Sequence, residues 1–180
     1  MANSNQAADQ PHEKLQILSF VLDGDSFGTE ISCIQEVLEY HKVTAVPRTP
    51  DYMLGVINLR GQVVPVVDLR HIFHMEVTEP TIDSCIIIVK IIIEGEETAL
   101  GVLADRVKEV VEFNLDEVNP PPRIGNRVNS YFIQGMVQHD DEFIILLQLE
   151  RVFSSEQLQD VLEPVEQITV DEISASEKTQ

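Results

Sequence analysis

The chain carries the same ordered set of features twice, and this internal repeat restricts its fold more than any other property of the sequence. Each copy runs through a hairpin pattern, one helical turn, a Glu-Val strand, a proline loop, a glycine, a second hairpin and a short helix. The two copies align Phe27-Gly28 with Leu100-Gly101, and Gly55 with Gly135. Short strands at close spacing are typical of small barrels. We therefore expect two similar β-subdomains of about five strands each; chance similarity between apolar stretches is the alternative.

The stretch Gly55–Leu69 predicts a hairpin with a charged tip. Its second arm, Val63–Val67, is rich in β-branched residues, which favour extended structure. Gly61 can adopt a positive φ without steric cost, so it suits the turn and places Arg60 at the tip. Pro65 has no N–H group to donate, so its strand is expected at a sheet edge or at a bulge.

The rest of the pattern predicts an all-β fold with short helices. Ser84–Ile93 is almost entirely β-branched or apolar, which is typical of a strand buried on both faces. Short helices are expected at Leu69–Phe73 and Leu149–Phe153, and a C-terminal helix from Ser154 to Leu162. Asp105 is expected to cap a further helical turn.

Polar composition sets the boundaries of the folded region. Residues 1–14 are expected to form a disordered tail, residues 15–163 the folded domain, and residues 164–180 an acidic flexible tail. No apolar signal-peptide core begins the chain, and no apolar run approaches the roughly 20 residues that span a bilayer. We therefore expect a soluble cytosolic protein.

The charge balance restricts the partners. The formal net charge is −19, whereas binding to phosphates requires clustered Lys and Arg. Nucleic acids and anionic membranes are therefore disfavoured as partners. Cys33 and Cys85 lie in apolar surroundings outside any CxxC pair, which indicates buried free thiols rather than a zinc or redox site.

Signatures of catalysis are missing from the sequence. It contains no P-loop, no GxGxxG cluster and no GxSxG elbow. His71 and His74 could share a metal but lack an evident third ligand, and the apolar neighbours of Cys33 argue against a nucleophile. We expect no catalytic residue, no metal and no cofactor.

The remaining candidates are surface groups. Glu36 and Val37 are neighbours in a strand-like run, so they face opposite ways, and a buried Val37 would leave Glu36 exposed or at the subdomain seam. The planar guanidinium of Arg60 suits a bidentate pair with Glu36. Three apolar residues could either form a small exposed face or pack in the core: Leu18, Ile31 and Ile34.

The first long hairpin carries the most specific pattern in the sequence. It reads Gly55-Val56-Ile57-Asn58-Leu59-Arg60-Gly61 and, after Gln62, Val63-Val64-Pro65-Val66-Val67-Asp68-Leu69. This pattern closely resembles the core motif of CheW, the coupling protein of bacterial chemotaxis. The resemblance covers residues 15–163 and includes Ile17-Leu18-Ser19-Phe20, Phe27-Gly28, Ile34-Gln35-Glu36-Val37, Pro47, Gly101-Val102-Leu103-Ala104-Asp105-Arg106-Val107 and Gly135.

The resemblance implies a fold and a role. It implies two intertwined five-stranded SH3-like barrels, packed side by side and sharing a seam. It also implies a non-enzymatic adaptor that binds the regulatory domain of the histidine kinase CheA and the cytoplasmic tip of methyl-accepting chemoreceptors, in clusters under the inner membrane. The same domain occurs in CheA and CheV, but this chain lacks room for their kinase or receiver domains, which favours a stand-alone adaptor.

The resemblance also implies site residues. Those expected to contact the kinase are Leu18, Ile31 and Ile34. Those expected near a receptor-binding groove between the subdomains are Glu36, Val37, Gly101 and Val102. Arg60, paired with Glu36, would hold the geometry of that region.

Two alternatives stay open at this point. The family also serves twitching motility and second-messenger signalling, so the pathway is not specified. A protein of another class, a small-ligand-binding double barrel, could use an apolar seam between the subdomains as its binding site.

Overall fold

The computed structural model describes residues 13–121, 128–153, 165, 168 and 172–173. In this part of the chain the fold consists of strands joined by turns and single helical turns. The elements are β1 (Lys14–Leu22), β2 (Asp25–Glu30), η1 (Ile31–Cys33), β3 (Ile34–Glu39), β4 (Met53–Leu59), β5 (Gln62–Val67), α1 (Leu69–Ile72), β6 (Cys85–Ile93), β7 (Glu96–Ala104), β8 (Arg106–Asn114), η2 (Leu115–Glu117), η3 (Ser130–Phe132), β9 (Ile133–His139), β10 (Glu142–Leu147) and α2 (Leu149–Val152).

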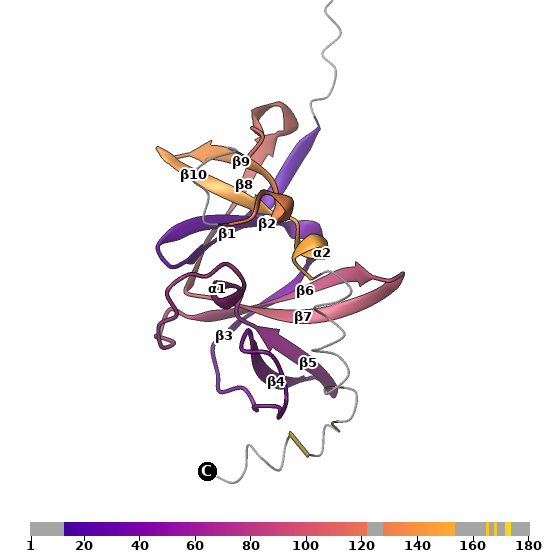
Figure 1. The fold of residues 1–180 in the computed structure, drawn as a ribbon. Helices are drawn as coiled ribbons and strands as arrows, with labels where there is room; N and C mark the ends of the chain where they lie inside the picture. Colours follow the sequence, from indigo (N-terminus) through magenta and orange to yellow (C-terminus); the bar gives the residue numbers. More distant parts are fainter. Residues whose placement is uncertain (1–12, 122–127, 154–164, 166–167, 169–171, 174–180) are drawn as a thin grey trace, which may run out of the picture.

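The strands form two five-stranded sheets, ordered β8-β1-β2-β10-β9 and β3-β6-β7-β5-β4. Figure 1 shows the first sheet above the second, with α1 and α2 at the level of the seam between them. The predicted all-β fold of two five-stranded subdomains is therefore confirmed. The predicted helix from Ser154 to Leu162 lies outside the described residues.

Each sheet combines strands from both repeats. The hairpin β1–β2 joins β8, β9 and β10, whereas the hairpin β6–β7 joins β3, β4 and β5. The two hairpins that cross into the other repeat's sheet are held by equivalent parallel pairings. Leu146 lies opposite Gly28 in the first sheet, and Val66 lies opposite Gly101 in the second. The subdomains are thus intertwined, with each repeat contributing its first hairpin to the sheet that the other repeat completes.

Close packing at these junctions requires glycine. A Cβ atom on Gly28 would lie 2.7 Å from Cδ1 of Ile17, and one on Gly101 would lie 2.9 Å from Cγ2 of Ile86. Both isoleucines are fully buried, so a side chain at either glycine would displace core atoms. The glycine at this position of each repeat therefore allows the crossing hairpin to pack closely against its neighbouring strands.

Most strands are buried on both faces. One face of each sheet packs around its own apolar cluster, which includes Val137 and Ile144 in the first sheet and Ile57 and Val64 in the second. The opposite faces meet in a larger cluster that fills the seam between the sheets. Its aromatic centre stacks Phe27 between Phe20 and Phe73, with ring centroids 6.2 and 6.1 Å apart.

A buried ion pair fixes the start of α1. Arg70 donates from Nε and Nη2 to the two carboxylate oxygens of Asp68, at 2.9 and 2.8 Å, and from Nη1 to Asp105 at 2.9 Å. The other oxygen of Asp105 accepts the backbone N–H of Asp23 at 2.7 Å, in the β1–β2 turn. Hydrogen bonding to Asp68 is the main reason why the pKa of Arg70 is raised. The network therefore connects the two sheets.

Two expectations about local structure are wrong. Asp105 caps no helix, because β8 begins at Arg106 and the Asp105 side chain is bonded within the ion-pair network. Val165 and Ile173, which were expected in a loose tail, are buried and belong to the cluster between the sheets. Among the described residues, no helix combines the length and the apolar character needed to cross a bilayer.

We expect the substitution Arg70→Met to lower the free energy of unfolding by about 3–5 kcal/mol, because the fully buried carboxylate of Asp68 would lose its cation. Urea denaturation measures this loss. Lys14→Met, which removes the exposed pair with Glu112, is the matched control and should leave the midpoint nearly unchanged. Equal effects of the two substitutions would contradict a structural role for the buried pair.

Candidate protein-binding surface

The most accessible apolar surface near the predicted site lies on η1 and β3. β3 is an edge strand of the second sheet and pairs with β6 on one side only. Its residues alternate, so that Ile34 and Glu36 are half-buried while Val37 is 41% exposed. Ile31 in η1 is 38% exposed. Edge strands with apolar side chains are sites where another chain can pack or add a strand.

A bidentate ion pair lies beside this edge. Arg60 donates from Nη1 and Nη2 to the two carboxylate oxygens of Glu36, at 2.7 and 2.9 Å. The structure therefore contains the pair that the sequence predicted. The orientation of β3 differs from the simplest expectation, because Glu36 faces inward and Val37 outward.

The turn between β4 and β5 presents Arg60 to Glu36. Arg60 and Gly61 have φ values of 49° and 85°, as in a type I′ hairpin turn. The side-chain oxygen of Asn58 accepts the backbone N–H of Gly61 at 2.9 Å and closes the turn. Sequence analysis missed this role of Asn58, although an Asn shortly before a turn glycine is a known signal for such a bond.

The ion pair joins the two edges of one sheet. Glu36 lies on β3 and Arg60 follows β4, and these strands are the outer members of the second sheet. The Arg60 side chain is 70% exposed and that of Glu36 21%. An exposed pair of this kind contributes at most about 1 kcal/mol to stability. Its main effect is to hold a cation in a defined place next to the apolar edge.

The first sheet has a related contact with different chemistry. Glu109, the repeat counterpart of Glu36, lies 3.0 Å from Nε2 of His139 at the β9–β10 turn, and Asp140 lies 3.3 Å from the same nitrogen. The ligand atoms of these three residues lie within 4.8 Å of one another, so they are the described residues that could hold a metal ion. His71 and His74 join no such group among the described residues.

Three of the predicted site residues do not reach the surface. Leu18 is 7% exposed and Val102 2%, and both belong to the cluster between the sheets. Gly101 is buried against Ile86 and Val66. Their assignment to partner contacts is therefore corrected, because burial on both strand faces leaves these strands no free face. Ile31, Ile34, Glu36 and Val37 remain together on one continuous segment.

The seam itself is packed with side chains. The aromatic and aliphatic cluster between the sheets occupies the space that a small-ligand-binding double barrel would need. A separate hollow of about 330 Å³ opens near η1, and its lining includes Cys33, Gln134 and Gln148. Its polar lining differs from the apolar pocket that the ligand-binding alternative requires.

Cys33 is in a state unsuited to nucleophilic chemistry. Its thiol donates to the backbone oxygen of Glu30 at 3.0 Å, and burial is the main cause of its raised pKa. Burial likewise raises the pKa of Cys85. Both residues are free thiols in the structure.

We expect Cys33 to react with a disulfide reagent more slowly than glutathione near neutral pH, since a raised pKa reduces the thiolate fraction. The rate should rise as the pH increases toward the raised pKa. Stopped-flow measurement on Cys85→Ser isolates Cys33, and Cys33→Ser isolates Cys85. A fast reaction that does not change between neutral and alkaline pH would indicate an activated thiolate instead.

Comparison with known proteins finds relatives that match most of the chain. The family model described as "CheW-like domain" matches residues 16–157. The chain is 28% identical to the chemotaxis protein CheW of Treponema pallidum, covering 82% of this chain and 86% of that protein. It is 31% identical to a probable chemotaxis protein CheW of Rhizobium etli, covering 77% and 87% respectively.

A solved structure extends the similarity to the fold. The crystal structure of the scaffolding protein TtCheW from Thermoanaerobacter tengcongensis superposes with a TM-score of 0.72 at 31% identity, covering 83% of this chain and 94% of that one. The matched region contains both sheets and the Arg60 turn. The chain therefore belongs to the CheW family of chemotaxis scaffold proteins.

Proposed function

We propose that the chain is a non-enzymatic adaptor that couples methyl-accepting chemoreceptors to the histidine kinase CheA. The observation that carries this proposal is the edge strand β3, which presents exposed apolar side chains next to a fixed ion pair. Membership of a scaffold family supports it. We further propose that the protein works in the cytoplasm, at receptor clusters under the inner membrane.

The apolar residues on η1 and β3 supply binding energy. Ile31 and Val37 are each more than one third exposed, and full burial of such a side chain contributes about 1.5–3 kcal/mol. Ile31 and Ile34 are assigned to the kinase regulatory domain, and Val37 with Glu36 to the receptor tip. Neighbouring contacts on one segment allow the two partners to be held close together.

Charge supplies selectivity. With a net charge of −19, the chain attracts partner surfaces that carry Lys and Arg, and it repels acidic ones. Arg60 is an exception at the proposed site, and Glu36 holds it in one orientation. A partner carboxylate or helix C-terminus would find a preorganised cation there.

Signal transfer needs no chemistry from the adaptor itself. An adaptor changes kinase activity only if it binds the active and inactive arrangements with different affinity. A rigid body with two adjacent contact regions is suited to this task, because movement of one partner changes the position of the other. The buried ion-pair network between the sheets provides that rigidity.

The apolar contacts predict separable binding defects. Ile31→Asp should weaken binding to the CheA regulatory domain by at least about tenfold, since it places a charge in an apolar contact. Val37→Asp should weaken receptor-tip binding to a similar degree. Isothermal titration calorimetry with each partner measures both effects. Ile82→Asp, at a 99% exposed position elsewhere, is the matched control and should change neither affinity.

Unchanged binding of both partners by Ile31→Asp and Val37→Asp, with circular dichroism like that of the original chain, would overturn the assignment of this surface. A loss of both partners in each variant would show that they share one contact region rather than two.

The ion pair predicts a rescue experiment. Arg60→Glu should repel Glu36 and impair kinase activation in reconstituted receptor arrays, while unfolding changes by no more than about 1 kcal/mol. The double variant Arg60→Glu/Glu36→Arg exchanges the two charges. It should restore part of the kinase activation if the ion pair acts by holding the edge strand β3 in place. No recovery in the exchanged variant would mean that a partner recognises the Arg60 cation directly.

The runner-up is an adaptor of the same family in a twitching or second-messenger pathway. It would use the same surface with different receptors, so binding to receptor tips from each pathway distinguishes the two. Among the described residues, the filled seam favours either adaptor over a small-ligand-binding protein.

A further inference from the structure

The first sheet has the same side-chain contact between its outer strands as the second, but one charge is reversed. In the second sheet, the guanidinium of Arg60 binds the carboxylate of Glu36 on β3. At the repeat position of Glu36, β8 carries Glu109, and at that of Arg60 the β9–β10 turn carries Asp140. The two turns have the same form, since φ is 49° at both Arg60 and Asp140. The first sheet therefore has a second carboxylate where the second sheet has a cation.

His139 lies between the two carboxylates. It is the last residue of β9, and its Nε2 atom lies 3.0 Å from Oε1 of Glu109 and 3.3 Å from Oδ2 of Asp140. The ring of Phe113 packs against the imidazole with centroids 6.0 Å apart and an angle of 89° between the ring planes, which restrains the imidazole. Nε2 carries at most one proton, whereas two carboxylates face it. Three potential ligand atoms therefore converge on one point.

The spacing of these atoms fits a tetrahedral Zn²⁺ ion. Zn²⁺ binds imidazole nitrogen and carboxylate oxygen at about 2.0–2.2 Å, which separates neighbouring ligand atoms by about 3.4 Å. The three ligand atoms lie within 4.8 Å of one another, and the two distances from Nε2 are 3.0 and 3.3 Å. A nitrogen ligand favours Zn²⁺ over Ca²⁺ and Mg²⁺, which prefer oxygen. The charge of the ion also balances that of the two carboxylates.

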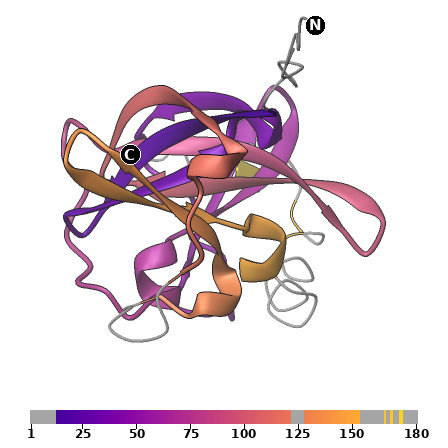
Figure 2. The ribbon, with the colours of Figure 1, turned by 90° about the horizontal axis from the view of Figure 1, so that it is seen from above.

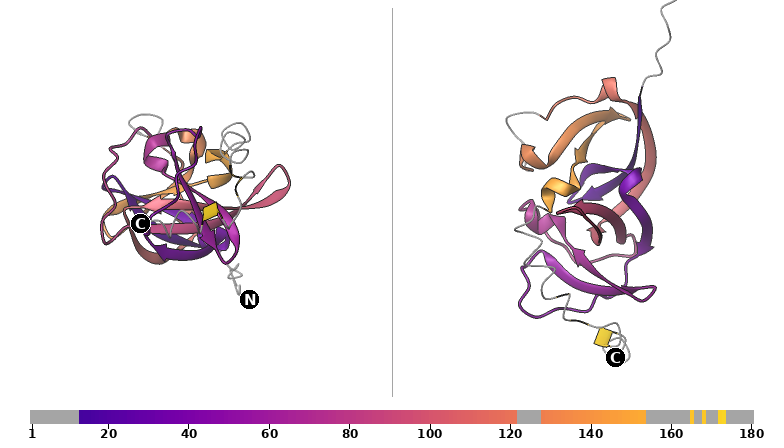
Figure 3. Two further views of the ribbon diagram at one scale, coloured as in Figure 1. Left: turned by 90° about the horizontal axis from the view of Figure 1, so that it is seen from below. Right: turned by 90° about the vertical axis from the view of Figure 1, so that its right-hand side faces the viewer.

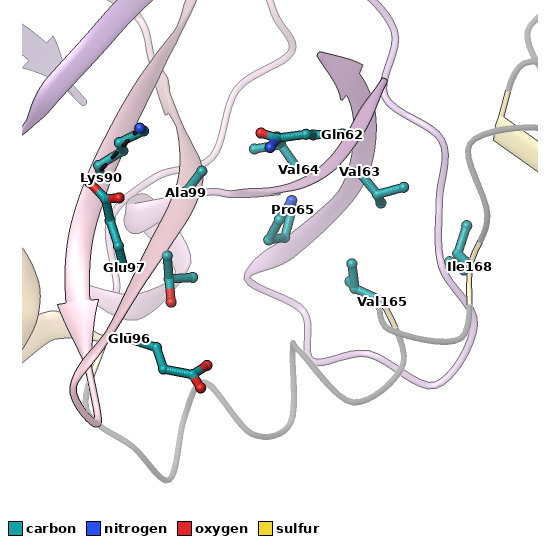
Figure 4. A pocket seen from close by; sticks show the side chains of 11 residues that line it. Gln62, Val63, Val64, Pro65, Lys90, Glu96, Glu97, Ala99, Val165 and Ile168 are labelled. Carbon is teal, nitrogen blue, oxygen red and sulfur yellow. Dashed lines mark ion pairs between the residues drawn. The ribbon is translucent and has the colours of Figure 1, made fainter. Parts of the chain in front are cut away.

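Carboxylates near the second sheet have a different environment. The β6–β7 hairpin, which projects from the rest of the sheet in Figures 2 and 3, carries Glu96 and Glu97. Figure 4 shows Lys90 beside Glu97 in the adjoining groove, and Nζ of the lysine lies 3.8 Å from Oε1 of the glutamate. The described residues that line this groove include no histidine. A lysine thus supplies the cation there, whereas the carboxylates around His139 face a nitrogen ligand.

We propose that Glu109, His139 and Asp140 form a binding site for one Zn²⁺ ion, with water in the fourth position. β8 and β9 are the outer strands of the first sheet, so the bound ion connects them as the Arg60–Glu36 pair connects the outer strands of the second. The expectation of no metal rested on sequence spacing, and the fold brings Glu109 to a histidine 30 residues further along the chain.

Isothermal titration calorimetry on the full chain tests the site, with Zn²⁺ in about 0.15 M salt and an excess of Mg²⁺ to occupy weak acidic sites. One Zn²⁺ should bind per chain. His139→Gln and, separately, Glu109→Gln should each weaken Zn²⁺ binding by at least about tenfold, because an amide is a weaker ligand than either group it replaces. His41→Gln changes an exposed histidine whose Nδ1 lies 3.3 Å from the backbone oxygen of Glu39, and this matched control should leave the affinity unchanged.

Nitrogen-15 NMR of the histidine side chains identifies the ligand atom. Addition of Zn²⁺ should shift the Nε2 resonance of His139 and leave its Nδ1 protonated, since a ligating imidazole keeps its proton on the other nitrogen. The resonances of His41, His71 and His74 should not change. In Glu109→Gln, the same shift should require at least about ten times more Zn²⁺.

An unchanged Zn²⁺ affinity in both His139→Gln and Glu109→Gln, with circular dichroism like that of the original chain, would overturn the proposal. Binding of one Zn²⁺ per two chains would also overturn it, since a second copy would then complete the site. Ca²⁺ binding as tight as Zn²⁺ binding would contradict a nitrogen ligand and show a nonspecific acidic surface instead.

Discussion

The exchange of hairpins between the two repeats determines most of this structure. Because β1–β2 and β6–β7 each cross into the sheet completed by the other repeat, neither half can form its sheet alone. The parallel pairings at Gly28 and Gly101 lock the crossing, and the absence of a side chain at each glycine permits the close approach. Both faces of most strands are consequently buried, one in the sheet's own cluster and one in the seam.

This two-sided burial leaves the strand edges as the accessible parts of each sheet. β3 has an exposed apolar side chain in Val37, and the Arg60 turn lies across the opening between the outer strands of its sheet. A groove of about 550 Å³ lies between the first halves of β5 and β7 in the same sheet, and Val165 and Ile168 are among the residues that line it.

The sequence predicted well those features that depend on residues close together in the chain. Gly61 and the β-branched run after it indicated the hairpin turn, and the guanidinium of Arg60 indicated a carboxylate partner. The repeat indicated two subdomains, and the family motif indicated their architecture. Leu18 and Val102, which the family resemblance put at partner contacts, are buried in the seam, and the sequence pattern of a strand does not say whether its second face meets water or another sheet. Asp105 was misread as a helix cap because its partner, Arg70, is distant in sequence.

The differences between the repeats separate architecture from function. Features that occur twice, such as Gly28 and Gly101, belong to the crossing of the hairpins. Arg60 occurs once, and its counterpart at the second hairpin tip is Asp140, where His139 approaches Glu109 instead. Only the second sheet therefore carries a guanidinium at this position, and a guanidinium stays charged at any physiological pH. In a chain with a net charge of −19, the Arg60–Glu36 pair therefore distinguishes the hairpin tip of the second sheet from that of the first.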